Sequence, residues 1–380
     1  MSNQSSRARA WRTMPALLAL GAALAASLVQ AGKPIPPAAP PVQYTMTLVP
    51  LSNVTGMNNL GDMVDGSTRL YDHSTGLAHD LAGPVNGLLN TPDEGLAYVA
   101  DLNDAWQITG GFLDSSGVVH AFRCALGYGE DGEIVASALE RLPERAGYPF
   151  GLPEAINNSG DVAGYVATDI NAPGEYRAVL WSSEGGVTEL GNVFSRAYDI
   201  SDRDATSGAV KVAGSLYLRA EQRAFLYDSL SGTMKDLGVL SRRTTSEGFA
   251  VNSSGQVAGK SYGGGRTEHS FRYTPGVGMV DLGTLGGSDY GNHAASLNAA
   301  GQVVGTAVTR LTNPFSVTGF LYTDANKMLD LARLIANPPA SLEYFEPKAI
   351  NDYPLHAFGQ IAGPAYVNGQ PAVILLTPDR

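Results

Sequence analysis

The chain has 380 residues, with 25 lysines and arginines against 36 aspartates and glutamates, which gives a formal net charge of −11. An acidic surface repels phosphate backbones, so this balance argues against nucleic acid as a partner. Cys124 is the single cysteine, which excludes an intrachain disulfide, so the core must stabilise the fold.

Residues 1–31 have the pattern of an export signal. Three arginines give a positive start, an apolar run extends over Met14–Leu28, and Val29–Ala31 supplies the small residues of a cleavage site. The apolar run is short for a membrane span, although an uncleaved N-terminal anchor is the alternative. No later stretch is long and apolar enough to cross a membrane. We therefore expect a secreted or periplasmic bacterial protein with no membrane span after signal removal.

The signal is followed by a proline-rich segment, residues 32–42, which is typical of a stiff, extended linker. The remaining residues, 43–380, are rich in glycine and show no sustained 3.6-residue apolar period. Both features favour strands and turns over helices. Without the three arginines of the signal, 22 basic residues face 36 acidic ones.

A ten-residue hairpin motif recurs through residues 43–380. Its clearest copies are Ala155–Gly164, Ala250–Gly259 and Ser296–Gly305. The seven anchor positions of all copies are Asn58, Asn103, Asn157, Ser201, Asn252, Asn298 and Asn351. They lie 44 to 54 residues apart, a period typical of β-propeller blades.

Each copy predicts four strands. The first strand ends at the anchor asparagine, whose side chain starts a type I turn, and a glycine three residues later closes the hairpin. A short second strand follows. The third strand is apolar, as in Arg223–Tyr227, and a short fourth strand carries an acid, as in Met279–Gly283. A short, charged outer edge protects a sheet from pairing with other chains.

The two ends of the chain indicate a closed ring. The last copy has a third strand at Ala372–Leu375 but no fourth strand, and an unmatched strand, Tyr44–Leu48, opens the mature chain. We predict that these strands pair. An open solenoid has no use for such a split repeat, so the predicted fold is an all-β, seven-bladed β-propeller closed by the N-terminal strand.

The repeat also resembles that of the HAF-repeat proteins, bacterial proteins expected to work outside the cell. Asp281–Gly287 and the hairpin at Asn298 match this repeat closely. The resemblance implies export and a repeat fold but no established activity, so no catalytic residues are carried over. The chain departs from the pattern at Ser201 and at Asp65, where other copies have glycine.

Metal ligands are not predicted. His120 and His269 occupy the repeat position that Arg177 fills elsewhere, so we interpret them as part of the repeat, and no histidine or cysteine spacing matches a zinc site. The segment Asn58–Gly66 is the closest match to a calcium loop. Most copies offer too few carboxylates for calcium, so we predict neither a metal nor a cofactor.

No catalytic residues are predicted either. A pair of carboxylates such as Glu154, Asp199, Glu346 or Asp352 could serve a glycosidase, but sequence does not give their separations. The sequence contains no nucleophile elbow and no phosphate-binding loop.

The loops carry the prediction of a binding surface. Connections between second and third strands, and from each fourth strand to the next blade, vary in length and lie on one face, where binding usually occurs. The candidate ligand-binding residues are Tyr148, Phe150, Phe194, Arg242, Arg243, Tyr262, Arg266, Tyr290, His293, Phe315, Tyr344 and Phe345. Exposed aromatics with arginines suit proteins or sugars.

Two functions follow as hypotheses. The first is a non-catalytic binding or scaffold protein that recognises a protein or glycan through the variable loop face. The second is a hydrolase or lyase acting on an extracellular polysaccharide. Convergent carboxylates in one deep pocket would favour the enzyme, whereas a broad aromatic surface would favour the binder.

Overall fold

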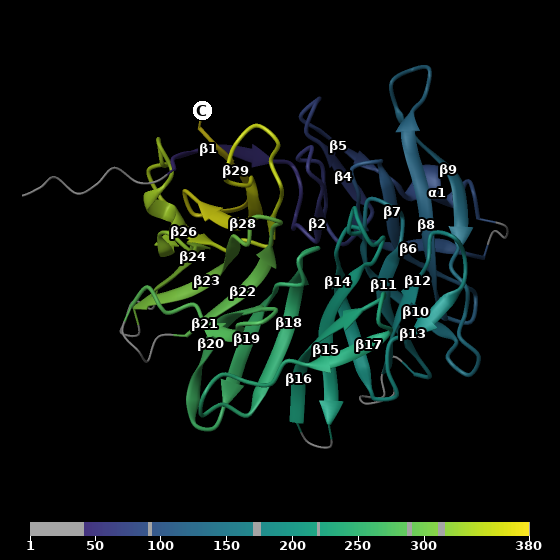
Figure 1. The fold of residues 1–380 in the computed structure, drawn as a ribbon. Helices are drawn as coiled ribbons and strands as arrows, with labels where there is room; N and C mark the ends of the chain where they lie inside the picture. Colours follow the sequence, from purple (N-terminus) through teal and green to yellow (C-terminus); the bar gives the residue numbers. More distant parts are fainter. Residues whose placement is uncertain are drawn as a thin grey trace, which may run out of the picture. The chain divides into compact units, whose positions relative to one another are not determined.

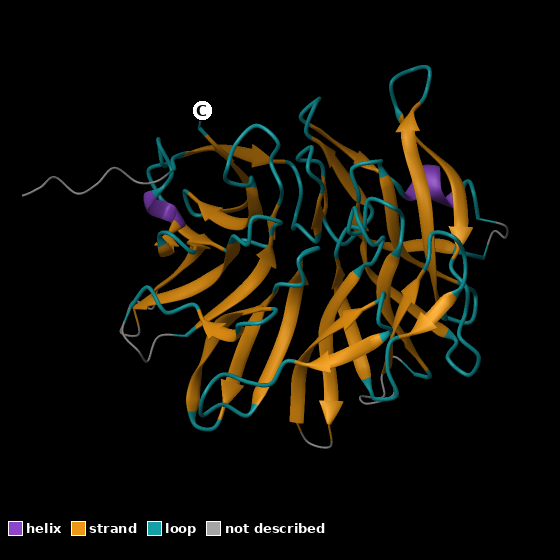
Figure 2. Ribbon diagram, viewed as in Figure 1, coloured by secondary structure: helices purple, strands orange, loops and turns teal. Residues whose placement is uncertain are grey.

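The computed structural model describes residues 42–89, 93–169, 176–218, 221–286, 291–310 and 316–379. These ranges form seven antiparallel sheets arranged in a ring, which we number as blades 1 to 7 in chain order (Figures 1 and 2). The predicted seven-bladed β-propeller is therefore confirmed. The predicted signal and nearly all of the linker lie outside the described residues.

Blade 1 contains β2 (Gly56–Met57), β3 (Met63–Val64), β4 (Arg69–Asp72) and β5 (Leu77–Asp80). Blade 2 contains β6 (Gly95–Leu102), β7 (Gln107–Leu113), β8 (Val119–Tyr128) and β9 (Ile134–Arg141). Blade 3 contains β10 (Phe150–Ile156), β11 (Val162–Ala167), β12 (Tyr176–Trp181) and β13 (Val187–Glu189). Blade 4 contains β14 (Ser195–Ile200), β15 (Lys211–Leu218), β16 (Glu221–Asp228) and β17 (Thr233–Asp236).

Blade 5 contains β18 (Thr245–Val251), β19 (Val257–Gly263), β20 (Arg266–Thr274) and β21 (Gly278–Asp281). Blade 6 contains β22 (Asn292–Leu297), β23 (Val303–Arg310), β24 (Ser316–Thr323) and β25 (Lys327–Asp330). Blade 7 contains β26 (Leu342–Phe345), β27 (Ala349–Ile350), β28 (Ile361–Val367), β29 (Gln370–Pro378) and β1 (Tyr44–Val49). The short helices α1 (Ala82–Asn86) and η1 (Leu331–Arg333) lie in connections between blades.

The N-terminal strand closes the ring. Strand β1 pairs antiparallel with β29, with Tyr44 opposite Pro378 and Val49 opposite Val373, and Figure 1 shows the purple strand beside the yellow one. This confirms the predicted pairing. The other side of Tyr44 is also bound, because its backbone N–H donates to the carbonyl oxygen of Leu334 at 2.8 Å.

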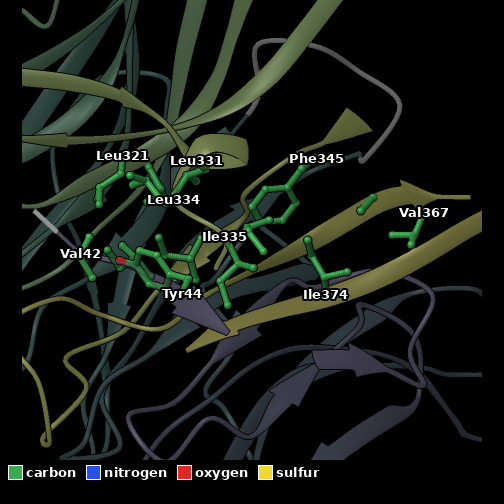
Figure 3. Packing of buried hydrophobic residues seen from close by; sticks show 14 residues of the cluster. Val42, Tyr44, Leu321, Leu331, Leu334, Ile335, Phe345, Val367 and Ile374 are labelled. Carbon is green, nitrogen blue, oxygen red and sulfur yellow. The ribbon is translucent and has the colours of Figure 1, made fainter. Parts of the chain in front are cut away.

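The closing strand is held by packing as well as by backbone pairing. The side chain of Tyr44 is fully buried and packs in one cluster with Ile335, Phe345 and Ile374 (Figure 3). A buried side chain of this size contributes about 1.5–3 kcal/mol through the removal of apolar surface from water. Strand β1 therefore belongs to the core of blade 7.

A bulge in the first strand explains the glycine of the repeat. In blade 5 the strand register shifts between Gly248 and Ala250, which leaves Phe249 without a partner on β19. The bulge brings the carbonyl oxygen of Glu247 to 1.9 Å from where a Cβ on Gly259 would lie. Only glycine fits there. The same shift precedes Gly164, Gly214 and Gly305 in other blades.

Blade 1 lacks this bulge, which accounts for Asp65 at the glycine position. The short strand β2 pairs regularly with β3. A side chain is therefore tolerated, and the Asp65 carboxylate accepts hydrogen bonds from the hydroxyls of Ser52 and Ser67, at 2.9 and 2.6 Å.

The acids of the fourth strands serve as local turn caps. The Asp236 carboxylate accepts from the backbone N–H of Gly238 at 2.7 Å, and the Asp281 carboxylate accepts from Gly283 in the same way at 2.9 Å. These hydrogen bonds fix the connection that leads to the next blade.

Candidate functional site

The first strand of each blade borders a central channel. Equivalent residues from all seven blades line this channel, which has an open volume of about 280 Å³. In six blades the lining begins three positions before the anchor, and in blade 2 it begins two positions before it, at Asp101; in each blade it ends at the residue after the anchor. The residues three positions before the anchor are Thr55, Glu154, Tyr198, Phe249, Ala295 and Lys348. Four of them, Glu154, Tyr198, Phe249 and Ala295, are the bulge residues of blades 3 to 6. The bulge thus places a non-repeating side chain at the channel in most blades.

The turn end of the channel is bordered by the anchor asparagines, whose side chains join neighbouring blades in what we call the asparagine ring. The amide of Asn103 donates to the backbone carbonyl oxygen of Asn157 at 2.9 Å, and the amide of Asn298 donates to that of Asn351 at 3.2 Å. Equivalent bonds join most neighbouring blades. The ring is interrupted at Ser201, whose side chain is too short to reach blade 5.

Two carboxylates inside the channel also join blades. Asp101 accepts from the backbone N–H of Ile156 at 3.0 Å, and Asp199 accepts from that of Val251 at 2.7 Å. Burial raises the pKa of Asp101 to about 7 and that of Asp199 to about 8. The Asp199 bond joins the pair of blades at which Ser201 interrupts the asparagine ring. We therefore assign both acids to the scaffold.

The opposite end of the channel opens on the face of the variable loops, and we call it the aromatic mouth. It has two halves, which meet where the rings of Tyr198 and Phe249 lie 5.9 Å apart. The Arg196 half contains Tyr98, Glu154, Tyr165, Tyr176, Arg196 and Tyr198. The Lys260 half contains Glu247, Phe249, Lys260, Glu268, His293 and Lys348.

In the Lys260 half the charges are paired. The Lys260 ammonium lies 3.5 Å from the Glu247 carboxylate and 3.4 Å from that of Glu268. It also lies 5.6 Å from the ring centroid of Phe249, within cation–π range. His293 lies 3.6 Å from Glu268, and burial lowers the pKa of its imidazole. Lys348 bonds to Glu346 on the same side.

In the Arg196 half the charges are separated. The Arg196 guanidinium carbon lies 3.7 Å above the ring centroid of Tyr176 and 4.9 Å from that of Tyr165. Burial raises the pKa of Glu154 to about 7, although the positive charge of Arg196 opposes this rise. Within the described ranges no group donates a hydrogen bond to the Glu154 carboxyl. A carboxyl with a pKa near neutrality can both donate and accept a proton.

The predicted loop residues occupy different environments. Tyr262 and His293 lie at the Lys260 half, and Tyr344 donates a hydrogen bond to Glu346 at 2.7 Å. The prediction for Phe345 as an exposed ligand-binding residue is wrong, because its side chain is 2% exposed and packs in the core of blade 7.

Other predicted residues lie away from the aromatic mouth. Phe194 is 41% exposed and stacks on Arg177, and Tyr148 packs on the core between blades 3 and 2. Phe150 begins β10, and Arg242 is exposed at a turn with positive φ. Arg243 donates to the backbone carbonyl oxygen of Thr267 at 3.2 Å.

The remaining predicted residues fall outside what the structure describes. Tyr290 and Phe315 lie outside the described residues, as does the side chain of Arg266. In the described part of the chain, no three His, Cys, Asp or Glu side chains are grouped so that they could hold a metal ion. No helix in the same ranges is long and apolar enough to span a membrane.

Several residues of the aromatic mouth were not predicted. Tyr98, Arg196, Tyr198 and Phe249 come from the first strands, whereas the sequence prediction concentrated on loops. Their signal is that the repeat varies in residue type at the bulge position and two positions before it. The sequence does not distinguish Glu154 from the other acids of the chain.

No protein-family model matches this chain, and no curated protein matches it. Among solved structures it is similar to the Dos1 propeller, with 10% identity, a TM-score of 0.46, and coverage of 88% of this chain and 95% of the other. It is also similar to a chain of the mitotic checkpoint complex, with 12% identity, a TM-score of 0.44, and coverage of 99% and 100%. The aldose sugar dehydrogenase from Streptomyces coelicolor shares 13% identity, with a TM-score of 0.36 and coverage of 90% and 100%. At these values the similarities carry no argument about function.

Proposed function

We propose that this protein is an exported bacterial binding protein that takes a glycan at the aromatic mouth. The observation that carries the proposal is the convergence of tyrosine and phenylalanine rings with carboxylates and cations at one end of the channel. Flat aromatic faces stack on sugar rings, and charged groups bond to sugar hydroxyls. The acidic balance of the chain disfavours nucleic acid as the ligand.

Export and family membership belong to the same proposal. The pattern of residues 1–31 supports export to the periplasm or the medium, and the repeat supports kinship with the HAF-repeat proteins. N-terminal sequencing of the secreted or periplasmic protein should begin at or near Gly32. Retention of Met14–Leu28 would show an anchored protein instead.

The binding proposal is tested with the full chain on a panel of neutral and acidic oligosaccharides. Isothermal titration calorimetry would compare the native protein with Phe249→Ala and Phe194→Ala. Phe249 lines the channel, whereas Phe194 is an exposed ring on the same face outside the aromatic mouth. We expect affinity to fall at least tenfold in Phe249→Ala and to change less than twofold in Phe194→Ala. A larger loss of affinity in Phe194→Ala than in Phe249→Ala would place the binding site at the variable loops near Phe194. If the native protein binds no oligosaccharide of the panel, the proposal is wrong.

An enzyme acting on a polysaccharide is a second candidate, favoured by one observation. Glu154 combines a pKa of about 7 with a position at the channel, as a general acid or base requires. If the protein cleaves glycosidic bonds, incubation with polysaccharides will release new reducing ends or unsaturated products. Glu154→Gln should then abolish release while leaving binding within a few-fold. Binding without cleavage by the native chain favours the first function.

A further inference from the structure

Arg196 differs from the other cations of the aromatic mouth in having no anionic partner. Its Nε is buried without a hydrogen-bond acceptor, and within the described ranges no hydrogen bond or ion pair reaches the guanidinium. Lys260, His293 and Lys348 each lie beside a glutamate. A guanidinium presents five N–H donors, and leaving a buried one, here the Nε–H, without an acceptor is costly.

The neighbours of Arg196 position the guanidinium without neutralising it. The centroids of two tyrosine rings, Tyr176 and Tyr165, lie 3.7 and 4.9 Å from the guanidinium carbon, within cation–π range. Glu154 is close enough for a charge interaction but forms no ion pair with Arg196. The guanidinium thus lies near a residue that lines the channel.

We infer that Arg196 recognises a carboxylate carried by the ligand, so that the ligand is a glycan with an acidic sugar unit. This inference rests on the proposed function and names the class of glycan. A planar guanidinium bonds to a carboxylate through two parallel N–H···O bonds, a geometry that neutral hydroxyls do not reproduce. The excess of 36 acids over 25 bases disfavours a densely charged polymer, so one carboxylate per binding unit fits best.

The test compares two ligands that differ only at the carboxylate. One is an oligosaccharide with a single glucuronic acid unit, and the other is the same oligosaccharide after reduction of its carboxyl group to an alcohol. We expect the native full chain to bind the acid roughly 10- to 100-fold more tightly than the alcohol, the range for a charged hydrogen-bonded pair. Arg196→Gln should remove this preference, and Arg196→Lys should restore part of it.

Arg177 provides a matched control. It stacks on the ring of Phe194 at 4.5 Å, much as Arg196 stacks on tyrosine, but its Nε lies 3.2 Å from the Glu189 carboxylate. Arg177→Gln should leave the preference for the acid within twofold. Melting curves of Arg196→Gln and Arg177→Gln show whether each variant is folded. If Arg196→Gln does not fold, the preference of Arg196→Lys for the acid over the alcohol is the deciding measurement.

Other outcomes separate this inference from the proposed function. Equal binding of the acid and the alcohol, with loss of both in Phe249→Ala, would overturn the role of Arg196 but keep a glycan site. If a sulfated oligosaccharide binds as tightly as the oligosaccharide with glucuronic acid, the specificity for a carboxylate is overturned. Binding of a polyglutamate peptide but of no oligosaccharide would overturn both, because the ligand would then be a protein.

Discussion

The side-chain amide of Asn351 donates a hydrogen bond to the backbone carbonyl oxygen of Asn58 at 3.0 Å, across 293 positions of the sequence. The bond joins the last blade to the first at the channel, while the pairing of β1 with β29 joins the two ends of the chain at the outer edge. The ring is thus closed near the channel by a hydrogen bond from a side-chain amide, and at its outer edge by backbone pairing between two strands.

The asparagine ring should contribute measurably to stability. Replacing Asn298 with alanine removes the donor to Asn351 and the acceptor for the backbone N–H of Gln302, which lies at 3.0 Å. Because these groups are buried, we expect the free energy of unfolding to fall by about 1–3 kcal/mol. Chemical denaturation measures this change. Ser159→Ala, at an exposed turn position, should stay within about 0.5 kcal/mol, and equal effects of the two would contradict a special role for the ring.

Because of the bulge, we expect a single added methyl group at Gly259 to destabilise blade 5. In Gly259→Ala the new Cβ would lie 1.9 Å from the carbonyl oxygen of Glu247, so either the bulge or the strand pairing must give way. We expect a clear drop in melting temperature and reduced ligand binding, since the bulge places Phe249. Gly127→Ala is the control, because nothing lies within 4 Å of its Cβ. A normal melting temperature for Gly259→Ala would show that the bulge is dispensable.

The channel carboxyls make stability depend on pH. Burial raises the pKa of Asp101 to about 7 and of Asp199 to about 8, so the folded protein favours their protonated forms. Their contribution is present below pH 4 and is lost as pH rises towards 8. Asp199→Asn never ionises and keeps one oxygen to accept from the N–H of Val251, while its amide nitrogen replaces the oxygen that accepts from the N–H of Ile200.

The expected result is that the melting temperature of the native chain falls relative to that of Asp199→Asn between pH 5 and pH 9. Thermal melts across this range provide the measurement. Glu133→Gln removes an exposed charge and should not change the pH dependence. A melting curve of Asp199→Asn that follows the native protein at every pH would contradict the assignment.

Deleting residues 43–51 removes strand β1 and should destabilise the whole ring. The deletion exposes β29 as an unpaired edge and empties the place of Tyr44 in the core. Each buried side chain that is lost costs about 1.5–3 kcal/mol, against a total stability of about 5–15 kcal/mol. We expect a much lower melting temperature or aggregation. Deleting residues 33–41 of the linker should have little effect on the melting temperature. An unchanged melting temperature in both deletion variants would contradict the role of β1 in closing the ring.

The sequence was sufficient to predict the blade count and the closure, because both depend on a repeat and on its split at the termini. The unmatched strand around Tyr44 and the missing fourth strand of the last copy can both be recognised in the sequence without any knowledge of distances. The strand order within each blade followed from the hairpin at each anchor, since a tight turn leaves only an antiparallel neighbour.

The site was harder to predict, because it depends on which strand faces the channel and on the bulge. Sequence does not show that Arg196 stacks on Tyr176, twenty residues earlier in another blade, or that Glu154 lies beside them. The variable loops were a reasonable expectation for a rigid scaffold. In this protein, however, the residues that gather at the mouth come mainly from inner strands, and one predicted loop residue, Phe345, is in the core.

The closure by β1 also sets the order of events during synthesis. Strand β1 is made long before its partner β29, because Tyr44 pairs with Pro378, 334 positions later in the sequence. At about 5–20 residues per second this interval is on the order of 15–60 s. During that time Tyr44 has no core to enter and β1 is an exposed strand. Among the described strands, β1 therefore stays unpaired for longest after it is made.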